Sequence, residues 1–490
     1  MRRRVPVFSR REMLAGSAGL VTFLAGCGRS EGPRGGVSIG RLSETRAGGT
    51  AVKLTAAEHP LVLADRNTPT PCWLYGETPF PVLRAKVGEP VSVSLANGLK
   101  EHTSIHWHGV RVPNAMDGVP YVTQMPVQPG ERFDYSFVPP DPGTFFFHPH
   151  CNTAEQLGRG LAGILVVEDP EDPAFDDEIV LVLKDWRIGD DGALLPFLTL
   201  DGASHAGTFG TLRTANGQNN PRIVVPAGAD IRLRLINADS SRVAEIGVEG
   251  AKAAIIAIDG NAVEPFALES WRLGPAMRLD LSLRTPEEGG EIRLFDYFAA
   301  QPVQLASFAA QGAPRRAGTF APTPLKPARL PEPDLAKPRE HQLRLSETAV
   351  ASEYPALDPI VLPDGSRIDL MDSLCVNMRT LWAVDGKSWP QSGHERLPPP
   401  LMKLAAGESV VVELVNATRY VHPMHLHGHT FKVLSSTRLR RPVHWADTVL
   451  VMPDERVKIA FVADNPGNWM IHCHIIEHQD TGMMAWFRVG

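Results

Sequence analysis

The sequence predicts an all-β protein of three Greek-key β-barrel or β-sandwich domains, and three observations lead to this prediction. The chain has 490 residues, enough for about two to four domains of ordinary size. Its 43 prolines and 43 glycines disfavour long helices and are typical of short strands joined by turns. One unit of turn and strand recurs three times along the chain, which indicates repeated domains of one architecture.

The composition excludes several classes of protein. Hydrophobic residues make up 43% of the chain and charged residues 21%, so we expect a buried core and no general disorder. The net charge of −6 suggests no broad basic face, and hence no nucleic-acid partner. The five cysteines, Cys27, Cys72, Cys151, Cys375 and Cys473, are too few for a disulfide framework. Cys72, Cys151 and Cys375 allow at most one intramolecular disulfide, and the pairing stays open.

Residues 1–27 are typical of a targeting segment and are set aside from the fold. The pair Arg10 and Arg11 precedes a mostly small and apolar run at 13–26, which is too short to span a bilayer as a stable helix. This arrangement resembles a twin-arginine export signal. We therefore expect the twin-arginine export machinery to deliver the protein to the periplasm or cell envelope.

The targeting segment ends in Leu-Ala-Gly directly before Cys27, which resembles a bacterial lipoprotein box. This resemblance implies that Cys27 is lipidated and that the protein meets a membrane only through this anchor. The alternative is a plain secretory signal cut near Ala25, with Cys27 incidental. Residues 28–50 are rich in Gly, Ser and Arg, which predicts a flexible tether.

The repeated unit is a glycine followed nine residues later by an asparagine, across an alternating or β-branched stretch. It occurs at 88–97, 228–237 and 407–416. Each copy predicts a turn followed by a strand. We expect a first domain at 51–170, a second at 171–312, a proline-rich extended linker at 313–340 and a third domain at 341–490.

The first and third copies share histidines that the second copy lacks. His106 and His425 each follow the repeat asparagine by nine residues. His148 and His472 each follow an arginine by sixteen. In the second copy Ile246 stands where the first histidine would fall, so we expect no metal ligands in the second domain.

Histidines separated by one residue are far more frequent than chance allows. Random placement of 17 His predicts about 0.6 such pairs by simple counting. The chain has five: His106/His108, His148/His150, His425/His427, His427/His429 and His472/His474. Residues i and i+2 of a strand face the same side, so each pair offers two imidazoles to one space. Four such strands offer more ligands than one zinc ion uses, which predicts a metal cluster between the first and third domains.

Cys473 lies between two of these histidines, so its sulfur is expected on the opposite side of the strand. His478 follows five residues later, Met483 ten residues later, and His422 precedes His425 by three. One cysteine, two histidines and a distant methionine are typical of a blue-copper electron-transfer site.

Four sequence motifs resemble those of the multicopper oxidases, in particular the three-domain, laccase-like bacterial members. They are His106-Trp107-His108-Gly109, His148-Pro149-His150, the run from His422 to Gly428, and the run from His472 to His478 with Met483. The resemblance covers about residues 50–490 and implies three cupredoxin-like domains. It also implies four copper ions as cofactors.

The resemblance assigns each ligand by its motif. The type 1 copper would use Cys473, His422, His478 and axially Met483; the type 2 copper His106 and His425; one type 3 copper His108, His148 and His474; and the other His150, His427 and His472. A reducing donor would lose single electrons at the type 1 copper. Cys473 would pass them through His472 and His474 to the cluster, where four electrons reduce dioxygen to two waters.

Proton supply is implied by the same resemblance. Asp117 resembles the acidic residue beside the cluster and would relay protons; the alternative is a turn aspartate before Gly118. Gln479 stands where related bacterial enzymes often have a carboxylate, which puts a second proton route in doubt. Glu477 and Asp480 are nearby, but strand alternation makes neither an obvious replacement. Asp447 is either a hydrogen-bond acceptor behind the ligands or a turn residue.

The donor is open at this stage. The resemblance implies laccase-type oxidation of phenols or amines first. Oxidation of cuprous or manganous ions comes second. The 13 methionines are scattered rather than gathered in the insert that cuprous-ion oxidases of the family often carry, and residues 114–121 resemble members linked to manganese oxidation as well as phenol oxidases. A non-catalytic structural relative is a remote alternative, since the ligand set is complete.

Overall fold

The computed structural model describes residues 42, 44–46, 51–64, 66, 68–347, 380–390 and 397–490, together with two short strands, β22 (Ile360–Val361) and β23 (Arg367–Ile368). The described residues belong to one compact unit that spans 38–490. The expected export signal at 1–27, Cys27 with its lipidation, most of the tether at 28–50, and Cys375 lie outside them. The boundaries expected between the domains stay predictions.

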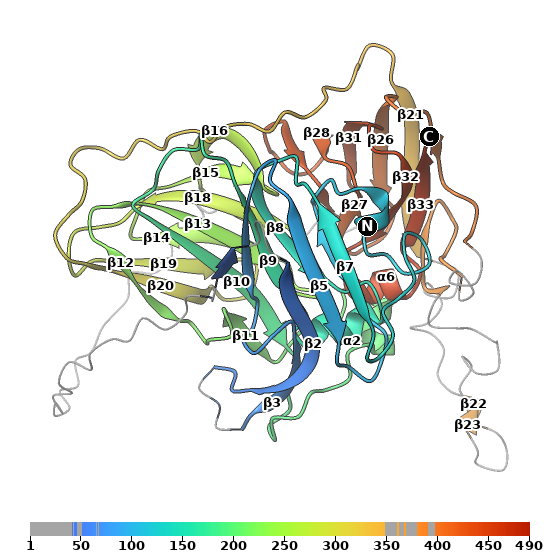
Figure 1. Ribbon diagram of the computed structural model, residues 1–490, viewed down its shortest axis with the longest axis horizontal. Coiled ribbons are helices and arrows are strands. Elements are labelled where there is room, and N and C mark those ends of the chain that lie inside the picture. The colour runs from blue at the N-terminus through green and yellow to red at the C-terminus, as the bar shows by residue number, and fades with distance from the viewer. Residues whose placement is uncertain are drawn as a thin grey trace, which may run out of the picture. The chain divides into compact units, whose positions relative to one another are not determined.

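The first sandwich contains the strands of residues 44–168, coloured blue to cyan in Figure 1. One sheet has the order β1 (Glu44–Arg46), β4 (Val82–Lys86), β9 (Gly163–Glu168), β8 (Gly143–His148), β6 (His106–His108); the other has β3 (Thr70–Leu74), β2 (Val52–Leu61), β5 (Val91–Asn97), β7 (Arg132–Phe137). Trp107 and Phe147 of one sheet pack with Leu95 and Tyr135 of the other, so the core lies between the sheets.

The second sandwich contains the strands of residues 177–311. One sheet has the order β11 (Leu212–Ala215), β10 (Asp177–Trp186), β13 (Asp230–Asn237), β18 (Arg278–Arg284), β15 (Ala253–Ile258), β16 (Asn261–Ala267); the other has β12 (Arg222–Pro226), β20 (Val303–Gln311), β19 (Glu291–Asp296), β14 (Ala244–Glu249), β17 (Trp271–Leu273). Leu233 and Leu281 pack across the core against Ile246 and Phe308.

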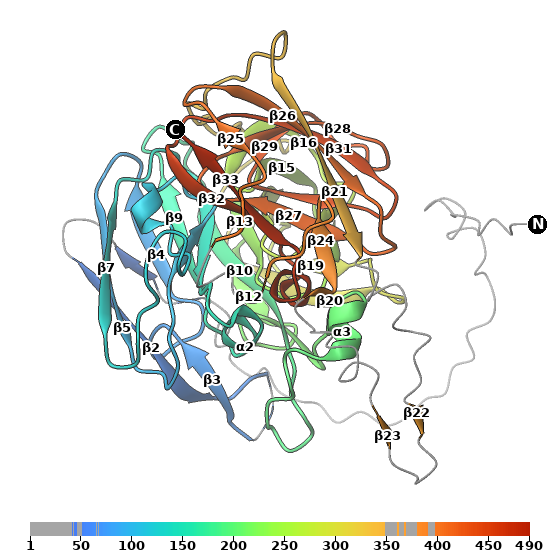
Figure 2. The ribbon, with the colours of Figure 1, turned by 90° about the vertical axis from the view of Figure 1, so that its right-hand side faces the viewer.

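The third sandwich contains strands of residues 339–489, drawn in orange and red in Figure 2. One sheet has the order β24 (Trp382–Val384), β21 (Arg339–Glu347), β26 (Ser409–Asn416), β31 (Arg456–Val462), β28 (Phe431–Ser436), β29 (His444–Ala446); the other has β25 (Lys403–Leu404), β33 (Met484–Val489), β32 (Gly467–Cys473), β27 (His422–Leu426), β30 (Thr448–Val451). Leu414 and Ile459 pack against Leu426 and Trp469.

Helices are few and short in the described residues, as the proline and glycine content predicts. They are η1 (Asn114–Met116), α2 (Thr153–Gly158), α3 (Leu200–Ser204) and α6 (Ile476–Asp480). Residues 312–338, which join β20 to β21, contain neither helix nor strand. A search of the described helices found none with the length and apolar character that crossing a membrane requires. The predicted all-β fold is confirmed.

The sequence repeat corresponds to one structural unit in each sandwich. Strands β5, β13 and β26 each pair in parallel with one neighbour and antiparallel with the other. The repeat glycines have φ of +77°, +53° and +83°, which a side chain disfavours. They make the turn before the strand.

The repeat asparagines do the same work at the end of each strand. The side-chain oxygens of Asn97, Asn237 and Asn416 accept a hydrogen bond from the N–H two residues later. Their amide nitrogens donate to a nearby carbonyl and to a carbonyl of a distant segment. Aspartate could not donate these bonds, and a longer amide would not fit the same turn, so the unit requires asparagine.

Candidate metal centre

Equivalent pairs of strands bring the histidines together. His106 on β6 lies opposite His148 on β8, and His425 on β27 lies opposite His472 on β32. The expected pseudo-symmetry between the first and third copies is therefore present in the strand register. We call His106, His108, His148, His150, His425, His427, His472 and His474 the histidine cluster.

The imidazoles of the histidine cluster point at one another, both between the first and third sandwiches and within the third. Nε2 of His106 lies 3.4 Å from Nε2 of His425. The same atoms are 3.3 Å apart in His148 and His474, and 3.1 Å apart in His427 and His472. In each of these three contacts the two histidines are ones that the resemblance assigns to the same ion. His150 lies close to His427 and His472, so these three could hold one ion together.

The outer ring nitrogens show which atoms are free for a metal. Nδ1 of His106, His148, His425 and His472 each faces a backbone carbonyl at 2.8–3.0 Å. A carbonyl only accepts, so each Nδ1 carries the proton and each Nε2 presents a lone pair to the cluster. Lone pairs that face one another at 3.1–3.4 Å repel unless a cation lies among them, so these residues fit bound metal.

His108 is turned the other way. Its Nε2 faces Asp447 Oδ1 at 3.1 Å, and its buried Nδ1 has no hydrogen-bond partner. His150 Nε2 is likewise buried without a partner. Burial and the neighbouring imidazoles lower the pKa of His108, His148 and His150, which keeps these rings neutral and ready to bind a cation.

Asp117 contacts one histidine of the first sandwich and one of the third. Its Oδ2 lies 2.9 Å from Nδ1 of His427, and its backbone carbonyl accepts from Nδ1 of His106 at 2.9 Å. The side chain is 1% exposed. Asp117 also ends η1, where its N–H donates to the Asn114 carbonyl. Asp117 is therefore both a turn residue and a neighbour of the histidine cluster.

Asp447 lies behind the ligands and is held by a buried arginine. Its Oδ1 accepts from His108 Nε2, and its backbone carbonyl accepts from His425 Nδ1. Burial alone would raise the pKa of Asp447, but the charge and two hydrogen bonds of Arg278 lower it well below its usual range. Arg278 comes from β18 of the second sandwich. No sequence pattern predicts this role for Arg278, because an arginine on an alternating strand is ordinarily exposed.

A separate group of ligands lies on the other side of β32, as the strand alternation predicts. Sγ of Cys473 lies 3.5 Å from Nδ1 of His422 and 3.8 Å from Nδ1 of His478. Those two nitrogens are 3.2 Å apart. Met483 is fully buried in the same apolar core as Cys473. We call these four residues the cysteine site.

The outer nitrogens of the cysteine site are also engaged. Nε2 of His422 lies 2.8 Å from the Thr418 hydroxyl, and Nε2 of His478 donates to the His205 carbonyl at 2.6 Å. Burial raises the pKa of the Cys473 thiol, so a thiolate there requires a cation to compensate it. A thiolate with two imidazole Nδ1 atoms and a thioether is the donor set of a blue-copper site.

Comparison with known proteins identifies the family. Three family models described as multicopper oxidase match residues 58–172, 177–312 and 374–490. The chain is 30% identical over 442 residues to the multicopper oxidase MmcO of Mycobacterium tuberculosis, covering 84% of this chain and 81% of that protein. This chain belongs to the multicopper oxidases.

Two further comparisons support the same conclusion. A laccase of Pycnoporus cinnabarinus is 26% identical over 465 residues, with 83% of each chain covered. The crystal structure of a multicopper oxidase from Pseudomonas thermotolerans superposes with a TM-score of 0.78 at 37% identity, covering 92% of this chain and all of that one. The predicted family and its cupredoxin-like fold are confirmed. The protein is an oxidoreductase with copper as its cofactor.

The multicopper oxidase has a cavity of about 460 Å³ that reaches the histidine cluster at His150. Gln479 and Asp480 line it, and Nε2 of Gln479 donates to Asp480 Oδ1 at 3.1 Å. The strand alternation expected for Glu477 and Asp480 is wrong, because both residues lie on helix α6, where consecutive side chains are not on opposite faces.

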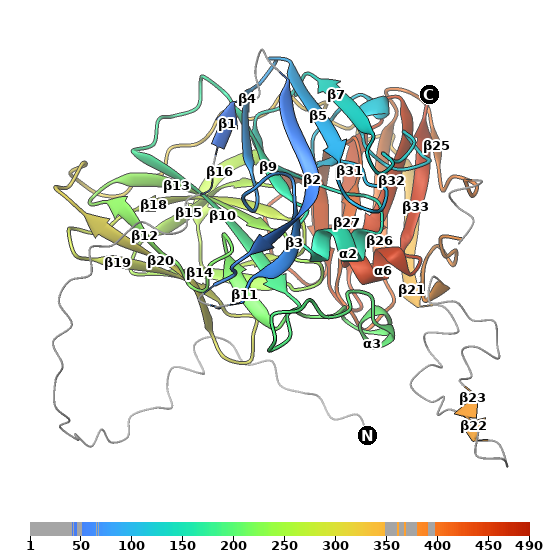
Figure 3. The same cartoon turned by 60° about the horizontal axis from the view of Figure 1, so that its bottom comes forward.

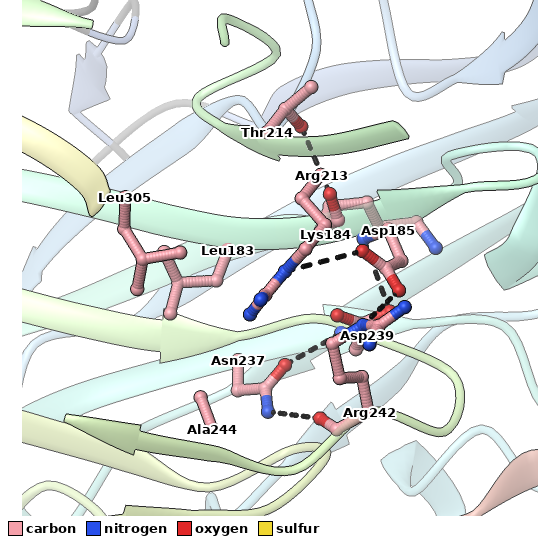
Figure 4. A pocket seen from close by; sticks show the side chains of 10 residues that line it. All are labelled: Leu183, Lys184, Asp185, Arg213, Thr214, Asn237, Asp239, Arg242, Ala244 and Leu305. Carbon is pink, nitrogen blue, oxygen red and sulfur yellow. Dashed lines mark hydrogen bonds and ion pairs between the residues drawn. The ribbon is translucent and has the colours of Figure 1, made fainter. Parts of the chain in front are cut away.

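The second sandwich of this multicopper oxidase holds buried charges instead of copper ligands. Figure 4 shows Lys184, Asp185 and Asp239 together with Arg213 and Arg242 around a cavity of about 10 Å³. That volume holds about one water molecule, so the group is a structural ion network rather than a substrate site. Burial lowers the pKa of Lys184, and burial with the nearby Asp185 raises the pKa of Asp239 to about 7.

Other predicted features have simple outcomes. Cys72, Cys151 and Cys473 are free thiols among the described cysteines. His429, the last member of the fifth histidine pair, lies buried against Phe461 and Phe487, with Nδ1 facing the His427 carbonyl. It packs in the core of the third sandwich and takes no part in either metal site as assigned by the resemblance.

Proposed function

We propose that the cysteine site binds one copper ion and the histidine cluster three, in a laccase-like enzyme that oxidises phenols or aromatic amines with dioxygen. The cysteine site (His422, Cys473, His478, Met483) would be type 1; His106 and His425 would hold type 2; His108, His148 and His474 one type 3 ion; and His150, His427 and His472 the other. This division follows the pairs of facing nitrogens described above.

One observation supports this proposal above the others. Strand β32 carries the sulfur of Cys473 towards one site and the imidazole of His472 towards the other, and His474, directly after the strand, faces His148 of the histidine cluster. Two metal sites are thus joined through three consecutive residues. A protein that only stored copper would not need this connection.

Bound copper supplies the redox chemistry: one-electron oxidation of the donor at type 1, and four-electron reduction of dioxygen to two waters at the cluster. The protein supplies the geometry. Backbone carbonyls fix the tautomer of four ligand imidazoles, and Asp447 with Arg278 fixes His108. The cysteine site is fully buried, and the histidine cluster is buried except at His150, which lines the 460 Å³ cavity.

Asp117 is the residue we propose as the proton relay. Its carboxylate faces the Nδ1–H of His427 and lies 3.2 Å from Nδ1 of His106. Its carboxylate thus contacts one ligand of the type 2 ion and one ligand of a type 3 ion in this assignment. A proton held on Asp117 is therefore adjacent to both.

Oxygen uptake tests the proposal. Copper-loaded protein should consume dioxygen with a phenol or aromatic amine, and Cys473→Ser should abolish this while keeping the copper of the histidine cluster. Cuprous and manganous ions are the comparison donors. Uptake with a metal ion alone would replace the laccase-like donor by a metal-ion donor, and uptake unaffected by Cys473→Ser would contradict the assigned electron route.

We also propose that the twin-arginine machinery exports the protein and that a lipid on Cys27 anchors it to the cell envelope. The paired arginines and the Leu-Ala-Gly-Cys sequence support this. Fractionation of cells that express the full chain should place it with the membrane, and Cys27→Ala should release it. Release should leave oxygen uptake unchanged, and a wild-type protein found free in the periplasm would contradict the anchor.

A further inference from the structure

A cavity of about 190 Å³ lies where the second sandwich meets the third. Glu245, Ser270, Trp271 and Arg272 line it on or next to β14 and β17, and residues 439–441 line it from the connection between β28 and β29. Figure 3 shows the two sandwiches side by side, the second in green and yellow and the third in orange and red, and β29 contacts β16. We call this space the arginine cavity. It has many times the volume that one water molecule needs.

Positive charge predominates in the lining of the arginine cavity. Its charged groups among the described residues are the guanidinium groups of Arg272, Arg440 and Arg441 and the carboxylate of Glu245, which give a net charge of +2. The Glu245 carboxylate is already engaged, because it accepts from the Ser270 hydroxyl at 2.7 Å and from Nε of Arg272 at 3.3 Å. It therefore compensates Arg272 and leaves the other two arginines without a counter-charge from the lining.

Arg441 is the least compensated of these arginines. Its Nη2 donates to the Leu450 carbonyl at 3.1 Å, and no carboxylate of the described residues lies within ion-pair distance of its guanidinium group. Burial lowers the pKa of Arg441; the more distant Glu455 opposes this shift, and the charge of Arg272 adds to it. A guanidinium group that loses hydration without gaining a partner costs free energy, and a bound anion would offset that cost.

The remaining wall of the arginine cavity is apolar and aromatic. Leu439 and the half-buried Trp271 line it. The indole ring is held in place by Phe266 and His444, each with 6.0 Å between ring centroids. Nε1 of Trp271 is buried and has no hydrogen-bond partner, so this wall contains one more donor without an acceptor. A ligand with an anionic end and a planar apolar body fits such a lining.

We propose that the arginine cavity binds an aromatic carboxylate, with the carboxylate group on Arg440 and Arg441 and the ring against Trp271. An anion among these guanidinium groups offsets their mutual repulsion, and a carboxylate matches the fork of N–H donors that an arginine presents. No residue of the histidine cluster or of the cysteine site lines the cavity. The inference therefore goes beyond the proposed function and does not depend on it.

Direct titration tests the site. Benzoate is the probe, because it carries the carboxylate and the ring but no phenolic hydroxyl that the enzyme could oxidise. Calorimetry on the copper-loaded full chain at low salt should give a Kd for benzoate below about 1 mM. Acetate lacks the ring, benzamide lacks the charge, and inorganic phosphate is an oxyanion without a ring. Each of these three should bind at least about tenfold more weakly than benzoate.

Removing one guanidinium group locates the binding. Arg441→Met should raise the Kd of benzoate at least about tenfold, because the methionine has a similar length but no charge and no N–H donors. Arg438→Met is the matched control, since Arg438 is exposed on the same connection and does not line the cavity. It should leave the Kd within about twofold, as expected for an exposed charge in solvent.

Two further variants keep the test decisive if Arg441→Met does not fold. Arg440→Met changes an exposed side chain and should raise the Kd of benzoate at least about threefold. Trp271→Leu removes the aromatic wall and should raise the Kd of benzoate at least about threefold, with the Kd of acetate unchanged.

Thermal unfolding gives an independent readout. The proposed ligand contacts both sandwiches, so it binds the folded protein and raises Tm. Benzoate should raise Tm of the wild type and of Arg438→Met equally, and should leave Tm of Arg441→Met and Arg440→Met less changed. Benzamide should have no such effect in any of them.

Four results would overturn the proposal. They are no saturable binding of benzoate to the wild type, equal loss of binding in Arg441→Met and Arg438→Met, benzoate binding unchanged in Arg440→Met, and phosphate binding as tight as that of benzoate. The last result, with benzoate binding unchanged in Trp271→Leu, would assign the cavity to inorganic oxyanions instead. Oxygen uptake and the blue absorption of type 1 copper are separate measurements, so each of these results leaves the proposed function standing.

Discussion

The second sandwich and its two neighbours show how one backbone unit carries two different kinds of chemistry. His106 faces His148 across β6 and β8, and His425 faces His472 across β27 and β32. At the same register of the second sandwich, Ile246 on β14 faces Asp296 on β19. Asp296 is occupied by Arg213 and by two backbone N–H groups. The same strand pairing therefore forms in a sandwich that has no ligands, so the pairing does not depend on the histidines.

The ligand-free sandwich nevertheless takes part in both metal sites. Arg278 on β18 holds Asp447, which orients His108 of the histidine cluster. The connection between β10 and β11 contacts the cysteine site, because the His205 carbonyl accepts from Nε2 of His478. A domain without ligands can thus fix the orientation of ligands that belong to other domains, because metal-binding imidazoles need partners for their outer nitrogens.

The largest effect should come from placing in the first sandwich the residue that the second sandwich has at the equivalent position. His106→Ile puts the residue of the ligand-free copy at a ligand position and removes one of the two type 2 ligands. Oxygen uptake should fall more than about 100-fold, since loss of an outer partner alone costs 10–100-fold. Copper content and oxygen uptake measure the change. The reciprocal Ile246→His should leave both unaltered, because Asp296 offers it no partner imidazole; copper gained there would contradict the comparison.

Breaking the contact from the second sandwich should be the next largest effect. Arg278→Met leaves the buried Asp447 carboxylate without its counter-charge, so the free energy of unfolding should fall by about 3–5 kcal/mol. Chemical denaturation of the metal-free protein measures it. Arg222→Met, which breaks an exposed pair with Glu291, should cost less than about 1 kcal/mol. Similar losses in the free energy of unfolding of the two variants would mean that the buried pair contributes no more to stability than the exposed pair.

The repeat asparagines should contribute equally in all three sandwiches. Asn97→Ala, Asn237→Ala and Asn416→Ala each leave buried backbone groups unpaired, so each should lower the free energy of unfolding by about 2–3 kcal/mol. The same denaturation experiment applies, with the exposed Asn219→Ala as control. A loss confined to the two ligand-bearing sandwiches would tie these asparagines to the metal sites rather than to the repeat.

The smallest effect on stability should come from His444, a buried histidine outside both metal sites. Burial lowers the pKa of His444 to about 4, although the Pro442 carbonyl opposes this shift. Below an unfolded pKa of about 6.5 the unfolded chain binds the extra proton, so stability should fall as pH drops from 6.5 towards 4. At pH 5.5 the loss should be about 1 kcal/mol. His444→Asn should flatten this part of the stability profile, and an unchanged slope would exclude His444 as its source.

The sequence alone determined the repeated unit and the members of the two ligand sets. The spacing of glycine to asparagine predicted a turn, a strand and its end, because the physical requirements of that unit are local: a positive φ at one end and an amide side chain at the other. The alternation of His472, Cys473 and His474 placed their side chains on opposite faces for the same local reason.

Only the tertiary structure decided what surrounds those ligands. Arg278 and Asp447 are 169 residues apart in the chain, and His205 and His478 are 273 apart. Nothing in the local pattern of a strand or a short loop says which distant carbonyl or carboxylate will meet an imidazole nitrogen. The helix at 476–480, which we had treated as a strand, shows the same limit over a short distance. Local spacing predicts which residues are ligands, whereas the orientation of those ligands and the access of solvent and donors to them depend on how the three sandwiches pack.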